Sequence, residues 1–227
     1  VDIARHLFAM LAEFTPEVEV FSIDEAFMDL TSAASTTEPE TIGRRIKRRI
    51  QDAYGLTCSV GIGPNKLIAK IGSNLQKPDG LVRVPQTQVA ALMRELPVED
   101  LCGVGSKLKA RLNELGIVTC EDLGAAAEPL LMKKFGIVGR YLKRMGQGVD
   151  HSPVMPFGAE GLVKSMGHAY TLPRDTEDDD EIQGTLLRLA ERVRLRALVR
   201  GAAAAIEAEA LFVPDQARAV DQRLQRT

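Results

Sequence analysis

The chain has 227 residues, of which 45% are hydrophobic and 26% charged, and its formal net charge is −2. This composition is typical of a globular protein long enough for two or three small domains. No apolar run approaches the length of a membrane span, and the first residues lack the charged-then-apolar pattern of an export signal. The three cysteines form no CxxC pair and no metal-finger spacing, so we expect a reduced protein of the cytoplasm.

The first 84 residues predict alternating strands and helices. The expected elements are a helix at 2–13, strands at 18–22 and 26–30, a helix at 40–53, a strand at 56–62, a helix at 66–75 and a strand at 81–84. The helix at 40–53 is amphipathic, since Ile42, Ile46 and Ile50 lie four residues apart. This order predicts an α+β fold with its helices on one face of the sheet.

The remainder of the chain changes in pattern. Pro85 and Pro97 bracket a short helix, and residues 98–150 have helical periodicity interrupted by glycine turns. Prolines and glycines predict a linker at 153–162. We expect a strand at 164–171 and then a helix from about 178 to 199.

The tetrad Ser22-Ile23-Asp24-Glu25 lies between the first two predicted strands. Adjacent residues of a strand point to opposite faces, so Asp24 and Glu25 serve one site only if the backbone turns or bulges there. A carboxylate pair on a hairpin suits a hard divalent cation, and Mg²⁺ is the usual choice when the substrate carries phosphates. The alternative is a solvated turn without function, which the dipeptide alone favours.

Lys70 and Lys77 are candidates for binding a triphosphate. Lys77 precedes the turn Pro78-Asp79-Gly80, and a lysine held by a rigid turn is a good point charge for phosphate. The alternative is a lysine placed near a helix C-terminus by the helix dipole. Residues 59–66 contain glycines but match neither the P-loop nor the dinucleotide fingerprint, so we reject both.

A helix-hairpin-helix signature, hydrophobic-Gly-hydrophobic-Gly, occupies residues 101–107. Its glycines bring backbone N–H groups to a helix N-terminus, where they hold a DNA phosphate regardless of base sequence. Lys109 and Arg111 would add positive charge. A weaker echo lies at 135–139. The residues expected to contact DNA here are Gly103, Val104, Gly105, Ser106 and Lys107.

Taken together, these segments resemble the Y-family translesion DNA polymerases of the DNA polymerase IV and UmuC-like type. The matching segments, in order, are 14–16, 22–27, 59–62, 65–70, 77–80, 103–105 and 164–168. The resemblance implies a palm-like antiparallel sheet with helices on one face, a helical thumb and the start of an α+β little finger. The implied boundaries are 1–84 for the palm, 85–152 for the thumb, 153–162 for the linker and 163–227 for a partial little finger.

The resemblance also implies residue roles. Asp24 would coordinate the catalytic Mg²⁺ that activates the primer 3′-hydroxyl, and Glu25 would support that site. Lys77 would contact the triphosphate of the incoming deoxynucleotide, with Lys70 close by. The residues that would touch template phosphates are Lys164, Ser165 and Arg174. The implied chemistry is two-metal nucleotidyl transfer across damaged DNA, and the implied partners are primer–template DNA, deoxynucleoside triphosphates and a sliding clamp reached through a segment outside this chain.

The resemblance is incomplete at both ends. A family member would begin with a strand that carries another catalytic aspartate, followed by the fingers, so we expect this chain to be inactive in DNA synthesis alone. The alanine-rich residues 201–210 depart from a strand-rich little finger. One alternative is a non-catalytic DNA-damage accessory protein on the polymerase fold, against which the retention of Asp24 and Glu25 speaks. Another is a structural DNA-binding module, which leaves the first 84 residues unexplained.

Overall fold

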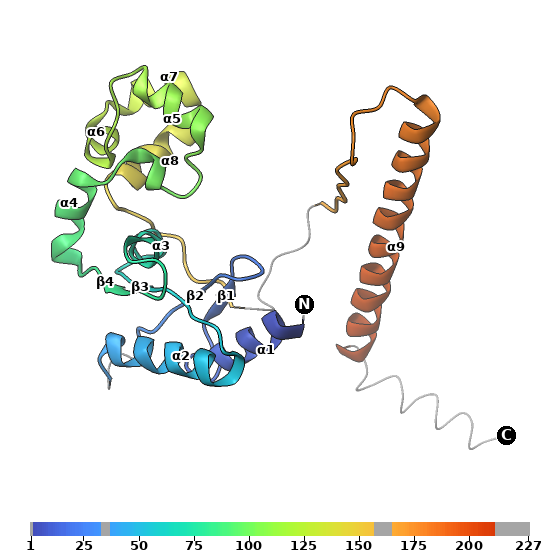
Figure 1. Cartoon of the computed structure of the whole chain (residues 1–227), viewed down its shortest axis with the longest axis horizontal. Helices are drawn as coiled ribbons and strands as arrows, with labels where there is room; N and C mark the ends of the chain where they lie inside the picture. Colours follow the sequence, from blue (N-terminus) through green and yellow to red (C-terminus); the bar gives the residue numbers. More distant parts are fainter. Residues whose placement is uncertain (1, 33–36, 157–164, 212–227) are drawn as a thin grey trace. The chain divides into compact units, whose positions relative to one another are not determined.

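The computed structural model describes residues 2–32, 37–156 and 165–211 of the chain (Figure 1). The chain divides into two compact units at residues 160 and 161. The first unit contains two small sheets and the helices α1 to α8, and the second contains the long helix α9. The mixed α and β content agrees with the fold class expected from the sequence.

A hairpin and two helices form the N-terminal layer. Its elements are α1 (Asp2–Leu11), β1 (Val18–Val20), β2 (Ala26–Met28) and α2 (Pro39–Tyr54). The strands pair antiparallel, with Val18 opposite Met28 and Val20 opposite Ala26. The isoleucines of α2 join the base of the hairpin in one buried cluster: Met10, Leu11, Val18, Ile42, Ile46 and Ile50. The base of the hairpin is therefore anchored in this cluster. The turn of the hairpin, residues 21–25, lies outside the cluster and contains Asp24 and Glu25.

A strand–helix–strand unit follows, made of β3 (Val60–Ile62), α3 (Lys66–Leu75) and β4 (Leu81–Arg83). Strands β3 and β4 are parallel, with Val60 opposite Leu81. The expectation of an antiparallel sheet is thus correct for β1 and β2 but wrong for β3 and β4. The reason is topological, because a helix that crosses between two strands returns the chain in the same direction.

Helices cover both faces of β3, which corrects the expectation that they lie on one. A Cβ atom added to Gly61 would stand 1.9 Å from the backbone oxygen of Ala69 in α3, so this close approach requires glycine. The neighbouring Val60 and Ile62 lie against Gly43 of α2. Because successive residues of a strand face opposite sides, α2 and α3 pack on opposite faces.

The helical part of the first unit comprises α4 (Gln86–Glu95), a 3₁₀ turn η2 (Val98–Asp100), α5 (Ser106–Asn113), α6 (Cys120–Ala125), α7 (Glu128–Phe135) and α8 (Ile137–Gly146). Its core is aliphatic, and Leu112, Leu123 and Leu131 are fully buried. The same cluster includes Ile68 and Ile71 of α3. The helical part therefore packs directly on the strand–helix–strand unit.

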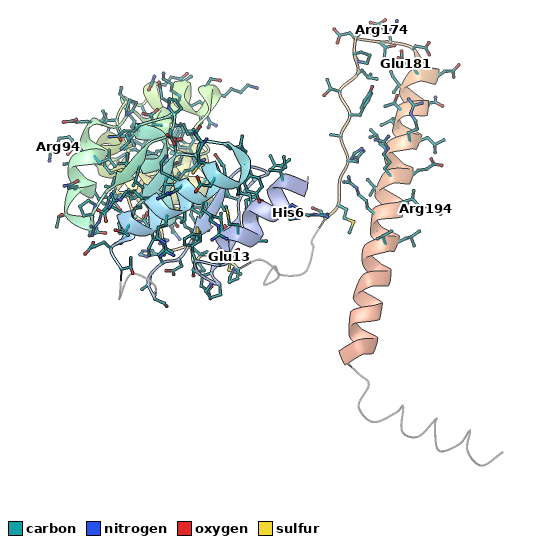
Figure 2. The ribbon with its side chains drawn as sticks, turned by 60° about the horizontal axis from the view of Figure 1, so that its bottom comes forward. His6, Glu13, Arg94, Arg174, Glu181 and Arg194 are labelled. Carbon is teal, nitrogen blue, oxygen red and sulfur yellow. The ribbon has the colours of Figure 1, made fainter. Side chains whose placement is uncertain are left out.

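The second unit consists, within residues 165–211, of an irregular segment and α9 (Asp179–Leu211). The predicted strand at 164–171 is wrong where the structure describes it, since residues 165–171 are irregular. A strand requires a hydrogen-bonded neighbour, and this unit has no other strand among those residues. The segment instead runs beside α9, where Arg192 contacts His168 at 3.0 Å and Arg174 pairs with Glu181 (Figure 2). Among the described helices, none is both long and apolar enough to cross a bilayer.

Candidate active site and nucleic-acid interface

The acidic pair lies in the turn between β1 and β2. The amides of Phe21 and Ser22 both donate to the carbonyl of Glu25, at 2.9 and 3.1 Å, and this closes the turn. The Ser22 hydroxyl donates to Oδ1 of Asp24 at 2.7 Å, and Asp24 is exposed. The backbone turn that two adjacent carboxylates need is therefore present, and one carboxylate is open to solvent.

Glu25 is engaged by a lysine of the neighbouring helix. The Lys70 ammonium, on α3, forms an ion pair with Oε1 of Glu25, and the two side chains are 18% and 35% exposed. The same ammonium lies 5.8 Å from the ring centroid of Phe21. Lys70 was expected close to the nucleotide; the structure brings it to the second carboxylate of the acidic pair.

A second lysine of α3, Lys66, binds strand β1 of the hairpin. Lys66 bonds both carboxylate oxygens of Glu19, at 2.8 and 2.7 Å, and lies 5.2 Å from the ring centroid of Phe27. Sequence reasoning missed this pair. The available signal was the spacing of Lys66 and Lys70, since residues four apart share one helix face.

Lys77 stands apart from these contacts. It is exposed and opens the turn to β4 through Pro78 and Asp79. Within the described residues, no hydrogen bond or ion pair joins Lys77 to Asp24, Glu25 or Lys70. Lys77 is thus a cation without a protein partner there, which leaves its ammonium available to a ligand.

The oxygen donors at the hairpin suit a hard cation but supply only part of its coordination. Asp24 and Glu25 offer carboxylate oxygens, the ligand type that Mg²⁺ prefers. Among the residues that the structure describes, no group of three or more His, Cys, Asp or Glu side chains could hold a metal ion. The two carboxylates would need further ligands, from water, substrate or another protein segment.

The predicted helix-hairpin-helix turn connects η2 to α5. Leu101 and Val104 are buried and anchor it, while Gly103 adopts φ +91°, a conformation that favours glycine. Gly105 caps α5 with no side-chain hydrogen bond, and the first turn of α5 carries no acidic residue. The first amides of α5 are therefore open to an anion, as a phosphate site at a helix N-terminus requires.

The basic residues near this turn differ in their availability. Lys109 is paired with Glu99, and the Arg111 guanidinium donates to the Lys134 carbonyl at 2.7 Å. Lys107 is exposed, and no ion pair involves it within the described part of the chain. Of the three cations expected to add charge for DNA, Lys107 alone is uncommitted within that part.

The structure describes two of the three residues that were expected to contact template phosphates in the second unit. Lys164 lies outside the described residues. Ser165 is exposed in the irregular segment. Arg174 lies 3.5 Å from Glu181 near the start of α9, so the protein itself provides its partner.

A cleft of about 510 Å³ lies between α3 and the residues that lead to the helix-hairpin-helix turn. Lys70 and Asn74 of α3 line one side, and Glu99, Asp100 and Cys102 line the other. The cleft thus joins the residue that holds Glu25 to the loop that precedes Gly103.

Comparisons with known proteins bear directly on this arrangement. Residues 1–74 match the impB/mucB/samB family, and residues 99–150 match the thumb domain of DNA polymerase iota. DNA polymerase IV of Moorella thermoacetica is 42% identical over 202 residues, covering 88% of this chain and 50% of that protein. DNA polymerase IV 2 of Bacillus subtilis is 41% identical over 198 residues, covering 85% of this chain and 48% of that protein.

The chain is a relative of the Y-family DNA polymerases. Solved structures agree: a Y-family chimera of Dbh and Dpo4 matches with a TM-score of 0.72 and 32% identity, over 84% of this chain and 55% of the chimera. An insertion ternary complex of Dbh DNA polymerase matches with a TM-score of 0.64 and 31% identity, over 85% of this chain and 56% of that one. The chain spans about half the length of the relatives it matches.

Proposed function

We propose that this chain is part of a polymerase that carries out template-directed DNA synthesis across damaged DNA. The observation that carries the proposal is the exposed Asp24 carboxylate beside Glu25 in a closed hairpin turn, with Glu25 held by Lys70 of α3. The names of the relatives support the same activity. In this proposal residues 1–84 belong to the palm, 85–152 to the thumb, 153–162 to a linker and 163–227 to a partial little finger.

Asp24 and Glu25 would bind a divalent cation, for which Mg²⁺ is our choice because the incoming nucleotide carries phosphates. When bound, two such ions would stabilise the attacking and leaving oxygens of phosphoryl transfer. Asp24 would contribute a carboxylate that no cation of the described residues neutralises, since its hydrogen-bond partner among them is the Ser22 hydroxyl. Glu25 would contribute less charge, because Lys70 already neutralises it. Lys77 would bind the triphosphate.

The thumb would hold the duplex through the first amides of α5, beyond Gly103 and Gly105. These amides lack a side-chain cap, so a DNA phosphate would provide the missing acceptor. The exposed Lys107 would add a second, sequence-independent contact. Ser165, Lys164 and Arg174 remain proposed template contacts, and Arg174 would have to leave Glu181 to make one.

A non-catalytic accessory protein is the second candidate. The observation that favours it is that the turn supplies two carboxylates, and no group of three or more His, Cys, Asp or Glu side chains among the described residues could hold a metal ion. Such a protein would bind primer–template DNA through the same α5 amides and leave Asp24 without a role.

Metal binding at Asp24 in the 227-residue chain distinguishes the two candidates. Mn²⁺ broadens the NMR signals of nearby amides, so it should broaden those of residues 21–25. Asp24→Asn should abolish the broadening. The control is Asp52→Asn, which removes an exposed carboxylate on α2. Primer extension with Mg²⁺ is measured in parallel, and we expect duplex binding without extension by this chain alone. Duplex binding with Mn²⁺ effects that ignore Asp24 would instead favour the accessory protein.

A further inference from the structure

Lys47 differs from the other basic residues of α2. Its side chain is 18% exposed, and its ammonium donates to the carbonyls of Cys58 at 2.5 Å and Asp79 at 2.8 Å. It also contacts the Gly80 carbonyl at 3.3 Å and forms an ion pair with the Asp79 carboxylate. One cation of α2 therefore binds the chain just before β3 and the turn just before β4.

The next residue of α2, Arg48, does not make such contacts. Arg48 is 85% exposed and forms only a surface pair with Asp52, one turn along the helix. Partial burial of an ammonium is unfavourable unless its donors are satisfied. Lys47 meets that condition because a lysine has three donors and four oxygens surround them. Its contacts thus have a specific geometry that a solvated lysine lacks.

The turn that Lys47 binds is the turn that carries Lys77. Asp79 has φ +61°, an uncommon conformation for a residue with a side chain. A Cβ on Gly80 would stand 2.4 Å from the backbone oxygen of Gln76, so the turn is also closely packed. The Gly80 amide donates to the Ser59 hydroxyl at 3.3 Å, and the Val60 amide donates to the Gly80 carbonyl at 3.0 Å. Lys47, from α2, adds its own hydrogen bonds to the Asp79 and Gly80 carbonyls of this turn.

We propose that Lys47 is a positioning residue for Lys77. By binding the carbonyls of Asp79 and Gly80 together with that of Cys58, it holds the 77–80 turn against β3. The exposed Lys77 ammonium is thereby presented from a fixed backbone, which reduces the ordering that phosphate binding would otherwise require. The inference rests on the proposed role of Lys77 in triphosphate binding.

The test measures binding of inorganic tripolyphosphate to the 227-residue chain by calorimetry. Lys77→Ala should weaken binding, and Lys47→Met should raise the dissociation constant roughly tenfold, as expected when a charge-assisted hydrogen-bond network is lost. Arg48→Met removes the same charge from the next residue of α2 and should change it less than twofold. Asp79→Asn should have an intermediate effect, because asparagine tolerates a positive φ and the carbonyl acceptors remain.

The outcomes separate the positioning role from the proposed role of Lys77. Equal losses in Lys47→Met and Arg48→Met would mean that only total charge matters, and would overturn the inference. An unchanged Lys47→Met with a weakened Lys77→Ala would overturn it while leaving Lys77 as a phosphate ligand. If Lys77→Ala binds normally, the proposed role of Lys77 fails first and the positioning role fails with it. Should Lys47→Met unfold, as shown by its melting curve, the Asp79→Asn variant decides.

Discussion

Replacing Gly105 by Asp should stabilise the thumb while weakening its hold on DNA. Gly105 caps α5 in an extended conformation, φ −80° and ψ 176°, which suits an aspartate cap. A Cβ at this position meets no atom within 4 Å, and the first turn of α5 has no acidic residue. The new carboxylate would accept hydrogen bonds from the same amides that we assign to a DNA phosphate.

The two effects have opposite signs and can be estimated. An Asp cap in place of Gly, together with its favourable interaction with the helix dipole, should add about 0.5–1 kcal/mol to the free energy of unfolding. The added carboxylate offsets one positive charge near the phosphate, so the slope of log K against log salt concentration should fall by up to about 0.9. The dissociation constant for a primer–template duplex should rise roughly tenfold or more at low salt, because the carboxylate also repels the phosphate.

Fluorescence anisotropy with a labelled duplex, from about 50 to about 200 mM salt, measures both the affinity and the slope. Urea denaturation measures the stability. The matched control is Ala127→Asp, which adds the same charge at the exposed N-cap of α7, another cap without a side-chain hydrogen bond. Equal losses of affinity in the two variants, or an unchanged salt slope in Gly105→Asp, would refute a phosphate contact at α5.

Four further outcomes follow from packing, capping and burial. Gly61→Ala should reduce the free energy of unfolding by about 3 kcal/mol or more, measured by urea denaturation, because its Cβ would stand 1.9 Å from a backbone oxygen of α3. Thr119→Ala breaks the capping box of α6 and should cost about 1 kcal/mol in the same assay. Backbone amides lower the pKa of Asp122 in that box. The contribution of its carboxylate to stability is therefore present above the ordinary pKa of 3.8 and is lost as the pH falls through the lower folded pKa. Denaturation at neutral and acidic pH should show this loss, and Asp122→Asn should remove the pH dependence. Burial raises the pKa of Cys120 to about 12, so iodoacetamide at pH about 8 should label the exposed Cys102 first, as read by peptide mass spectrometry.

Local patterns predicted the elements of this chain better than their partners. Helix 66–75 has the predicted limits, because Asn65 accepts the Ile68 amide as a cap and the apolar residues have helical spacing. The direction of β4 was predicted wrongly because strand patterns contain no information on pairing, although the intervening helix favoured a parallel pair. The predicted strand at 164–171 failed for a related reason, since residues 165–171 have no neighbouring strand within the described part of their unit.

In the candidate site too, the sequence predicted the backbone turn but not the side-chain partners. The turn at Asp24 and Glu25 could be expected, because adjacent residues of a regular strand cannot share a site. The partner of Glu25 could not, because it depends on how α3 packs beside the hairpin. Lys70 was predicted to lie near the nucleotide, which stays a prediction, and the structure adds an ion pair with Glu25 that the sequence did not indicate.

The two lysines of α3 explain how so short a hairpin can hold the acidic turn in place. Strands of three residues have few hydrogen bonds, and an isolated hairpin of this size is only marginally stable. Lys66 fixes β1 through Glu19, and Lys70 fixes the turn through Glu25, so both ends of the exposed tip are tied to one helix. Glu19 also accepts the Met155 amide at 2.8 Å, and Lys66 donates to the Pro153 carbonyl at 3.2 Å. The segment that leaves the helical part is therefore bound to the same strand that leads to Asp24, through the Lys66–Glu19 ion pair and these two hydrogen bonds.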